Sequence, residues 1–329
     1  MKTPDTLLLT GSEIAELLTL PDCIEAVEEA FRLHGEGLAL APGVLGMHAR
    51  EGGFHIKAGL LHLRRNYFAA KTNANFPCNP SRGLPLIQGL VLLFDGDRGC
   101  LLAAMDSTQI TIRRTGAATA IAAKHLSRAD SRTITICGCG NQGREHLRAL
   151  TQVRKLERGF AWYIDFAAAK RFAADMATVC SLEPVRDLSP ALRQSDICVT
   201  CTPAEKYFIR AEDLQPGTFV AGVGADNEHK QELDPLLFGS GNKVVVDVLD
   251  QCASIGDLHH AIKAGVTGRE GVHAELGEII CGKKAGRLLD EEITIYDSTG
   301  MALQDVASAA MAYEKAMMMG KRKKLDFMG

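Results

Sequence analysis

Residues 133–147, TITICGCGNQGREHL, constrain the fold more strongly than any other stretch. A run of β-branched residues leads into three glycines with the spacing G-x-G-x-x-G, and a helical pattern follows. In a strand–turn–helix unit, these glycines allow a tight turn, close approach of a pyrophosphate, and close packing of the helix. The free amides at the start of the helix then face the phosphates. The loop therefore predicts a dinucleotide site with the candidates Gly138, Gly140, Asn141, Gln142 and Gly143.

The segments after this loop alternate in type. Short apolar runs indicate strands near 133–137, 160–164, 196–200, 218–222 and 244–247, and helical patterns lie between them at 142–151, 167–179 and 188–194. Such alternation is typical of a parallel sheet covered on both faces, so the predicted class is α/β with a Rossmann-type doubly wound sheet.

The preceding half of the chain has a different pattern. Two helices are predicted within 12–34, strands at 54–61, 67–76 and 87–95, and an Ala-rich helix over 107–126. A long helical pattern covers 299–320, and we expect the basic end, 321–329, to be solvated or disordered. The first half therefore reads as helices followed by mainly antiparallel strands.

Charge and cysteine content narrow the class of protein. The net charge is only −3 and the basic residues are scattered, so we expect no nucleic-acid partner. The N-terminal apolar run contains acidic residues, which is untypical of a signal peptide, and we expect a cytoplasmic protein without a membrane partner. No pair of matching C-x-x-C motifs is present, so no metal site is predicted.

Asp165 bears on the choice of cofactor. It follows Gly143 by 22 residues and stands at the end of the second predicted strand, where a carboxylate accepts hydrogen bonds from both adenosine ribose hydroxyls. A 2′-phosphate would be repelled there. This favours NAD(H), and the nearby Lys170 and Arg171 keep NADP(H) as the alternative.

Two loops after predicted strands contain candidates for chemistry, because ligands of such sheets bind at the carboxyl ends of the strands. Thr202, in TCTPA, is placed to meet ribose or phosphate, and the alternative is an ordinary loop. Asp226, in AGVGADNEHK, is a candidate proton donor or acceptor. The alternative for Asp226 is a cap of a following helix.

The first half offers cations suited to a carboxylate. Lys71 ends an apolar strand, a poor position for a solvated lysine, and Arg114 lies with Arg113 at the expected start of the Ala-rich helix. Arg114 could instead pair with Asp106. His55 and Lys57 alternate with period two, so both point either into a cleft or to solvent.

Seven motifs together resemble the ornithine cyclodeaminase/mu-crystallin family over nearly the whole chain: KTNANFP, GLPLIQGLVLLFD, IRRTGAATA, CGCGNQG, DICVTCTP, GADNEHKQELD and YDSTGMALQD. The resemblance implies a Rossmann domain at 117–299. It also implies a discontinuous α+β substrate and dimerisation domain at 1–116 plus 300–329, and hence a homodimer.

By the same resemblance, Lys71 meets the substrate carboxylate and polarises the reacting carbon–nitrogen bond, Arg114 holds the carboxylate, and Asp226 is the acid/base. The residues implied on the cofactor side are Thr115, Thr202, Gly224, Lys230 and Ser298.

Three positions depart from the family pattern. The P-x-R motif reads Pro42-Gly43-Val44, so one carboxylate-binding arginine is missing, and Arg50 or Lys57 is expected to replace it. The motif G-L-P-T here ends in Leu86. Cyclodeaminases carry an acid in the first sheet for the distal ammonium of a diamino acid, whereas FHIKAG has none and brings Lys57, which would repel that ammonium.

The resemblance implies a small imino-acid or amino-acid substrate. Motifs such as FH-x-KAG and NANFP most resemble the members that reduce Δ1-pyrroline-2-carboxylate to L-proline, or its six-membered homologue to pipecolate. The alternatives are an ornithine cyclodeaminase, an alanine-type amino acid dehydrogenase, and a protein that binds nucleotide without turnover.

Overall fold

The computed structural model describes residues 5–39, 43–320 and 323–325. The contacts within the chain define two compact units: unit 1 is Met1–Arg114 with Met301–Gly329, and unit 2 is Thr115–Gly300. The sequence placed the domain boundaries at 116/117 and 299/300. Among the described residues, no helix combines the length and the apolar character needed to span a bilayer.

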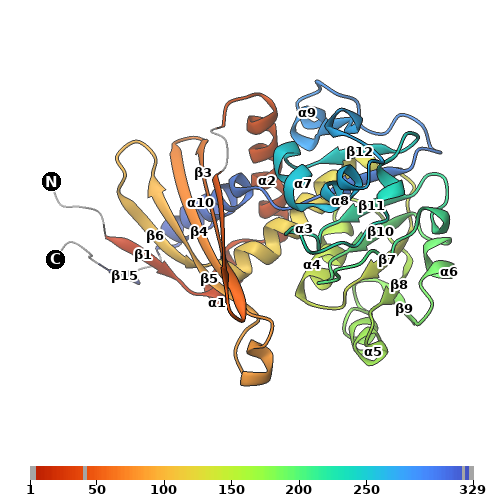
Figure 1. Ribbon diagram of the computed structural model, residues 1–329. Coiled ribbons are helices and arrows are strands. Elements are labelled where there is room, and N and C mark those ends of the chain that lie inside the picture. Colours follow the sequence, from red (N-terminus) through yellow and green to blue (C-terminus); the bar gives the residue numbers. More distant parts are fainter. Residues whose placement is uncertain (1–4, 40–42, 321–322, 326–329) are drawn as a thin grey trace. The chain divides into compact units, whose positions relative to one another are not determined.

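Unit 2 is built on an eight-stranded sheet in which all the described strand pairs are parallel. The strand order is β13-β12-β14-β11-β10-β7-β8-β9, and Figure 1 shows β7, β8 and β10 side by side. The chain runs outward from β7 (Thr133–Cys137) to β9 and then returns to the other side of β7 as β10 (Ile197–Thr200). This reversal is the switch point at which doubly wound folds bind ligands, and it confirms the predicted α/β class.

The remaining elements of unit 2 connect these strands. They are α4 (Asn141–Leu150), β8 (Arg158–Trp162), α5 (Phe166–Asp175), β9 (Ser181–Val185), α6 (Ser189–Leu192), η2 (Ala211–Asp213), β11 (Phe219–Gly222), η3 (Pro235–Phe238), β12 (Lys243–Val246), α7 (Leu249–Ile255), α8 (Asp257–Lys263), η4 (Arg269–Gly271), β13 (Ala274–Glu275), α9 (Leu276–Ile280) and β14 (Thr294–Asp297).

Three strands of unit 2, β9, β13 and β14, were not predicted, and β8 was misplaced. The edge strand β9 contains Glu183 and Pro184, and a proline is tolerated only at an edge. The interior strand β14 has four residues, as have β10, β11 and β12, which were predicted, so its length alone does not explain the miss. The strand β8 ends at Trp162, two residues earlier than expected. Asp165 is therefore not the residue that ends the strand.

Unit 1 contains a seven-stranded sheet of described strands in the order β15-β1-β6-β5-β4-β3-β2. The elements are β1 (Thr6–Leu9), α1 (Gly11–Leu17), α2 (Leu20–Gly35), β2 (Gly43–Ala49), β3 (Gly52–His62), β4 (Asn66–Asn75), η1 (Asn79–Arg82), β5 (Ile87–Asp95), β6 (Leu101–Asp106), α10 (Ala302–Met318) and β15 (Lys324–Leu325). The helix α3 (Ser107–Leu126) begins here and continues into unit 2.

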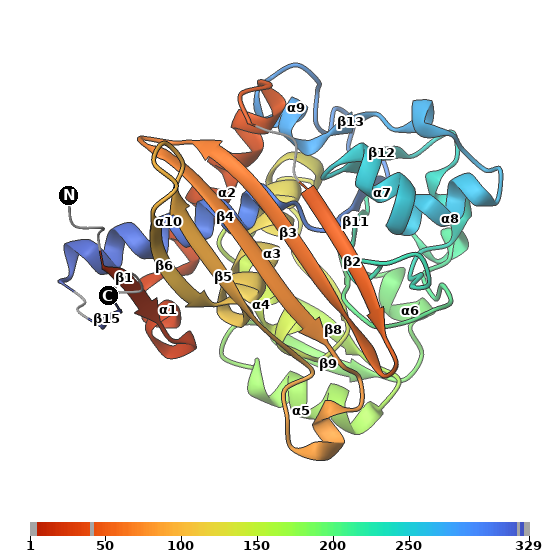
Figure 2. The same ribbon diagram turned by 60° about the vertical axis from the view of Figure 1, so that its left-hand side comes forward.

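One face of this sheet is covered by helices. Figure 2 shows β2 to β6 in front, with α10 and α2 behind them. The register places Lys57 opposite Lys71, and Lys71 opposite Val91, so these three side chains belong to one row on one face. Lys57, Lys71 and Val91 are all buried, which identifies their face as the one under the helices.

Two expectations for this unit need correction. Strand β15 pairs with β1 through Thr6 and Leu325, so part of the basic end is ordered in a sheet; residues 321–322 and 326–329 lie outside the described residues. The helix α3 begins at Ser107, which places Arg113 and Arg114 in its second turn and not at its start. Pro42 also lies outside the described residues.

Candidate functional site

Unit 1 gathers three cations and one carboxylate under α10. Lys57 and Lys71 come from adjacent strands, Arg114 from α3 and Asp305 from the first turn of α10. The Nζ atom of Lys71 lies 2.8 Å from Oδ1 of Asp305 and 2.7 Å from Oδ2. The Nε atom of Arg114 lies 3.3 Å from Oδ1 of Asp305. We call these four residues, with Gln304, the cationic cluster.

The cationic cluster holds more positive than negative charge in a dry environment. Side-chain exposure is 3% for Lys71, 8% for Arg114 and 3% for Asp305. Burial lowers the pKa of Lys71 to about 7, against the opposing effect of Asp305. Burial acts to raise the pKa of Asp305, but Lys71 and Arg114 outweigh it and hold that pKa below its usual value. A further anion would therefore be stabilised at this position.

A buried donor of the cationic cluster, on Gln304, supports the same conclusion. Arg114 NH1 donates to Oε1 of Gln304 over 2.9 Å. Nε2 of Gln304 is buried and makes no hydrogen bond to any described residue, whereas Nε of Arg114 has the Asp305 carboxylate as its ion-pair partner. Buried donors without acceptors cost free energy, so a ligand with acceptor oxygens would be favoured here.

The other predicted residues of unit 1 lie in different environments. His55 is half-buried two residues before Lys57 on the same face of β3, so the interpretation that both residues face solvent is wrong. Arg50 is exposed in the turn after β2. Asp106 accepts from the amide of Gln109 at the start of α3, whereas Arg114 contacts Asp305, so the alternative in which Arg114 pairs with Asp106 is wrong.

The glycine loop of unit 2 has the shape that a dinucleotide needs. Gly138 has a φ of +114°, which excludes most side chains, and its amide donates to the carbonyl of Trp162. A Cβ at Gly143 would lie 2.1 Å from the carbonyl oxygen of Gly138. At Gly140, by contrast, a Cβ would meet no described atom within 4 Å. Asn141 and Gln142 then open α4, so backbone amides and open space coincide where a pyrophosphate would bind.

Asp165 caps the helix that follows the second strand. Its Oδ1 accepts from the amide of Ala167 over 2.9 Å, and its Oδ2 lies 3.5 Å from Arg171. The carboxylate is 55% exposed, so its second oxygen remains accessible to a ribose. The position is three residues beyond β8, because Tyr163 and Ile164 intervene.

Two neighbouring strand ends of unit 2 carry the other predicted residues. Thr202 follows β10 and is buried, whereas Asp226 follows β11 and is 48% exposed in a loop. No helix begins directly after Asp226, so the capping alternative is wrong; its carboxylate pairs with Lys230 over 2.7 Å. Ser298, after β14, is buried and donates to Asp247. Thr115 is buried within α3.

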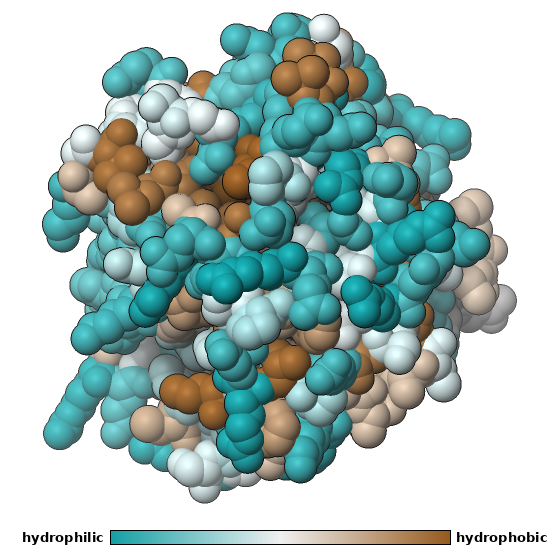
Figure 3. Space-filling view, turned by 90° about the vertical axis from the view of Figure 1, so that its right-hand side faces the viewer, coloured by the Kyte–Doolittle hydropathy of each residue, from teal (hydrophilic) through white to brown (hydrophobic). Residues whose placement is uncertain are grey.

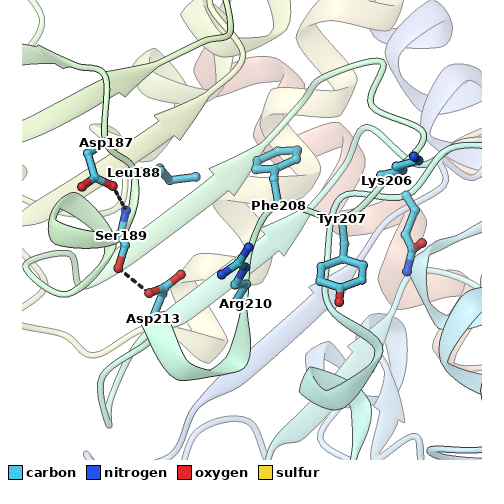
Figure 4. A pocket seen from close by; sticks show the side chains of 9 residues that line it. Asp187, Leu188, Ser189, Lys206, Tyr207, Phe208, Arg210 and Asp213 are labelled. Atoms are coloured by element: carbon cyan, nitrogen blue, oxygen red, sulfur yellow. Dashed lines mark hydrogen bonds between the residues drawn. The ribbon is translucent and has the colours of Figure 1, made fainter.

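A cavity of about 630 Å³ lies next to these loops, in unit 2 (Figure 4). The lining comes from the chain after β9, the segment after β10, and one residue beside Lys230: Asp187, Leu188, Ser189, Lys206, Tyr207, Phe208, Arg210, Asp213 and Gln231. Phe208 stacks on Trp162 at a centroid distance of 4.9 Å. Within the described chain, none of the predicted site residues lines this cavity.

Sequence reasoning missed Asp305, Gln304 and Glu232. The first two lie in ALQDVASAA, where polar residues interrupt an otherwise apolar helix, and that interruption was the available signal. Glu232 accepts hydrogen bonds from Thr202 and from Gly224. It lies in a polar stretch of the sequence, so its residue type gave no sign that it is buried.

The doubly wound sheet and the bare glycine loop at its switch point define a dinucleotide-binding fold. The chain belongs to the ornithine cyclodeaminase/mu-crystallin family, whose model matches residues 4–320. The family resemblance inferred from the motifs is thereby confirmed.

Individual relatives agree with this assignment. The chain is 39% identical to an alanine dehydrogenase of Archaeoglobus fulgidus, covering 98% of this chain and 99% of the relative. An archaeal alanine dehydrogenase dimer solved with bound NAD matches with a TM-score of 0.94 and 38% identity, covering 98% of this chain and 100% of the other.

A second solved structure is the Δ1-pyrroline-2-carboxylate reductase of Thermococcus litoralis in complex with NADH and L-proline. It matches with a TM-score of 0.91 and 32% identity, covering 96% of this chain and 98% of the other. The expectation of an oxidoreductase that uses NAD(H) is confirmed by these relatives.

Proposed function

We propose that the protein is an NADH-dependent reductase of α-imino acids, with Δ1-pyrroline-2-carboxylate as substrate and L-proline as product. The six-membered homologue, which yields pipecolate, fits the same chemistry. The observation that carries the proposal is the burial of Lys71 and Arg114 beside a single carboxylate, Asp305, with the Nε2 donor of Gln304 left for a further acceptor.

In this proposal Lys71 and Arg114 bind the substrate carboxylate. Two cationic donors hold a carboxylate more rigidly than one, and such fixation of the reacting carbon lowers the barrier. Lys71 also polarises the carbon–nitrogen bond. His55 and Lys57, on the same face of β3, line the substrate site. Arg50 is exposed and is therefore a weaker candidate than Lys57 to replace the carboxylate-binding arginine of the family's P-x-R motif.

Reduction of an imine adds a hydride to carbon and a proton to nitrogen. The reduced nicotinamide supplies the hydride. Asp226 holds the proton of the imine nitrogen, which makes the adjacent carbon a better acceptor. Lys230, at 2.7 Å, orients the Asp226 carboxylate, and the exposure of that carboxylate allows exchange of protons with water.

The competing functions make different demands. Ornithine cyclisation needs an anion for a second ammonium, whereas Lys57 brings another buried cation to the cluster. An alanine-type dehydrogenase would use the same groups with pyruvate and ammonia, and the similarity to the Archaeoglobus fulgidus enzyme favours keeping it as the second candidate.

The test is oxidation of NADH, followed at 340 nm, with freshly generated Δ1-pyrroline-2-carboxylate. Pyruvate plus ammonia, and ornithine plus NAD with ammonia release as readout, run in parallel. Rapid oxidation with the cyclic imine supports the proposal. Turnover confined to pyruvate and ammonia would assign the alanine-type reaction, and ammonia from ornithine would assign a cyclodeaminase.

We predict that Asp165→Ser reduces the preference for NADH over NADPH by about 10-fold, measured as the ratio of kcat/KM values. Serine retains the helix cap, which limits the loss of stability, but removes the charge that repels a 2′-phosphate. Arg171, 3.5 Å from Asp165, is then available to the phosphate. The matched control is Asp187→Ser, whose carboxylate also accepts from an amide two residues on, and an equal shift in both variants would refute the role.

We also propose a homodimer assembled through unit 1. The sheet face away from α10 exposes Leu45, Met47, Phe54 and Leu90, an apolar patch that a second copy would cover. The face shown in Figure 3 is mostly hydrophilic, with separate apolar patches. The similar archaeal alanine dehydrogenase is a dimer, which supports this proposal.

A further inference from the structure

Glu232 is fully buried and forms hydrogen bonds with residues at the ends of two strands of unit 2, β10 and β11. One oxygen, Oε1, accepts from the amide and the hydroxyl of Thr202, both over 2.6 Å. The other, Oε2, accepts from the Thr200 hydroxyl over 2.6 Å and from the Gly224 amide over 2.7 Å. One carboxylate thus satisfies four donors that follow or end β10 and β11.

The backbone around Glu232 is itself held in place. Its amide, like that of Leu233, donates to Oδ1 of Asp257, over 2.8 and 3.0 Å. Its carbonyl accepts from the amides of Phe208 and Ile209. A carboxylate fixed on both sides in this way is a rigid template for the two loops above it.

Gly224 shows how closely the loop after β11 approaches this template. A Cβ at Gly224 would lie 2.3 Å from the carbonyl oxygen of Thr202 and 2.5 Å from the carboxyl carbon of Glu232. The close approach therefore requires a glycine, and it places the loop that carries Asp226 directly against the loop that carries Thr202.

The loops after β10 and β11 lie on one side of the switch point, and the glycine loop and Asp165 lie on the other. In doubly wound folds each side binds one mononucleotide half of the cofactor. The β7–β8 side carries the features suited to the adenosine half, so the β10–β11 side serves the nicotinamide half.

We propose that Glu232 is a positioning residue for the nicotinamide half of NADH: its carboxylate sets the conformation of the Thr202 and Gly224 loops and does not touch the cofactor. This inference rests on the proposed function only for the presence of a dinucleotide. It is separate from the identity of the imino acid.

Glutamine would not replace Glu232, although it has the same shape. Two of the four partners, the amides of Thr202 and Gly224, can only donate. They face different oxygens of the carboxylate, so the NH2 group of glutamine would confront one of these amides in either orientation. One loop would then lose its anchor while the volume of the side chain stays the same.

The experiment measures binding of NADH, by its fluorescence, and of AMP, by calorimetry, to the full chain and its variants. For Glu232→Gln we expect the Kd of NADH to rise about 10- to 100-fold, the effect of losing a hydrogen bond to a charged group. The Kd of AMP should stay within about 2-fold, because AMP uses only the β7–β8 side.

Two further variants keep the test decisive. Thr200→Val removes one hydroxyl whose described partner is Glu232, and we expect a smaller rise in the NADH Kd with unchanged AMP binding. Asp196→Asn is the matched control: Asp196 accepts from the amides of Arg132 and Thr133 at the amino ends of β7 and β10, opposite to the carboxyl ends where the cofactor would bind, so cofactor binding should not change.

Equal weakening of NADH and AMP in Glu232→Gln would show a general structural role and overturn the inference, as would unchanged binding of both. If Glu232→Gln does not fold, Thr200→Val alone decides by the same comparison. None of these measurements uses an imino acid. A protein that binds NADH but reduces no imine would refute the proposed function and leave the inference standing.

Discussion

Asp226→Asn is expected to lower kcat for reduction of the imino acid by about 10²- to 10⁴-fold, the usual contribution of a general acid or base. Asparagine keeps the shape of the side chain but cannot hold a transferable proton. Because the Asp226 side chain is 48% exposed in a loop, we expect the free energy of unfolding to change by no more than about 0.5 kcal/mol.

The comparison for this variant is Glu228→Gln, which removes a carboxylate from the same loop two residues away. Steady-state kinetics should show a near-normal kcat for Glu228→Gln, and NADH fluorescence should show a near-normal Kd for both variants. If Asp226→Asn retained more than about a tenth of the wild-type kcat, another group would have to supply the proton.

The second large effect concerns Lys71. Lys71→Met should lower kcat/KM for the imino acid by about 10²- to 10³-fold, because a buried charged hydrogen bond to the substrate is lost. The same change should lower the free energy of unfolding by about 3 kcal/mol, since Asp305 keeps its buried charge and loses its closest partner. Urea unfolding and steady-state kinetics measure the two effects separately.

The double variant Lys71→Met/Asp305→Asn separates stability from function. Neutralising Asp305 removes the charge that lost its closest partner but takes the anion from Arg114, so less than half of the lost stability should return, whereas kcat/KM should stay low. Recovery of kcat/KM in the double variant would mean that Lys71 serves only to neutralise Asp305. That result would exclude a direct role for Lys71 at the substrate.

The sequence was sufficient for the class of fold and for the glycine loop. Residues 133–137 form a fully buried strand whose β-branched pattern is unambiguous, and the glycines after it depend on local geometry alone. Local patterns failed for the two edge strands β9 and β13 and for β14. The four residues of β14 and the proline-containing β9 are strands only because neighbouring strands hold them in the sheet.

The candidate site was predictable only in part, for a related reason. Lys71 was identifiable because it interrupts an apolar run, although it lies within β4 and not at the end of a strand; its partner Asp305 is 234 residues away along the chain. Asp165 was taken as the end of a strand, although β8 stops at Trp162 and the carboxylate caps α5. A contact between distant segments, or a shift of two residues in a strand, leaves no local trace in the sequence.

The division of the chain has a consequence for its synthesis. Unit 2 is one continuous segment, Thr115–Gly300, whereas unit 1 needs α10, which begins at Ala302. When a nascent chain has emerged from the ribosome only as far as residue 300, it contains Lys57, Lys71 and Arg114 but lacks the helix that carries Asp305. Domains fold as units during translation, so unit 2 can fold on the ribosome before α10 is available to unit 1. Until α10 packs, the three cations that are buried in the folded protein stay exposed to water.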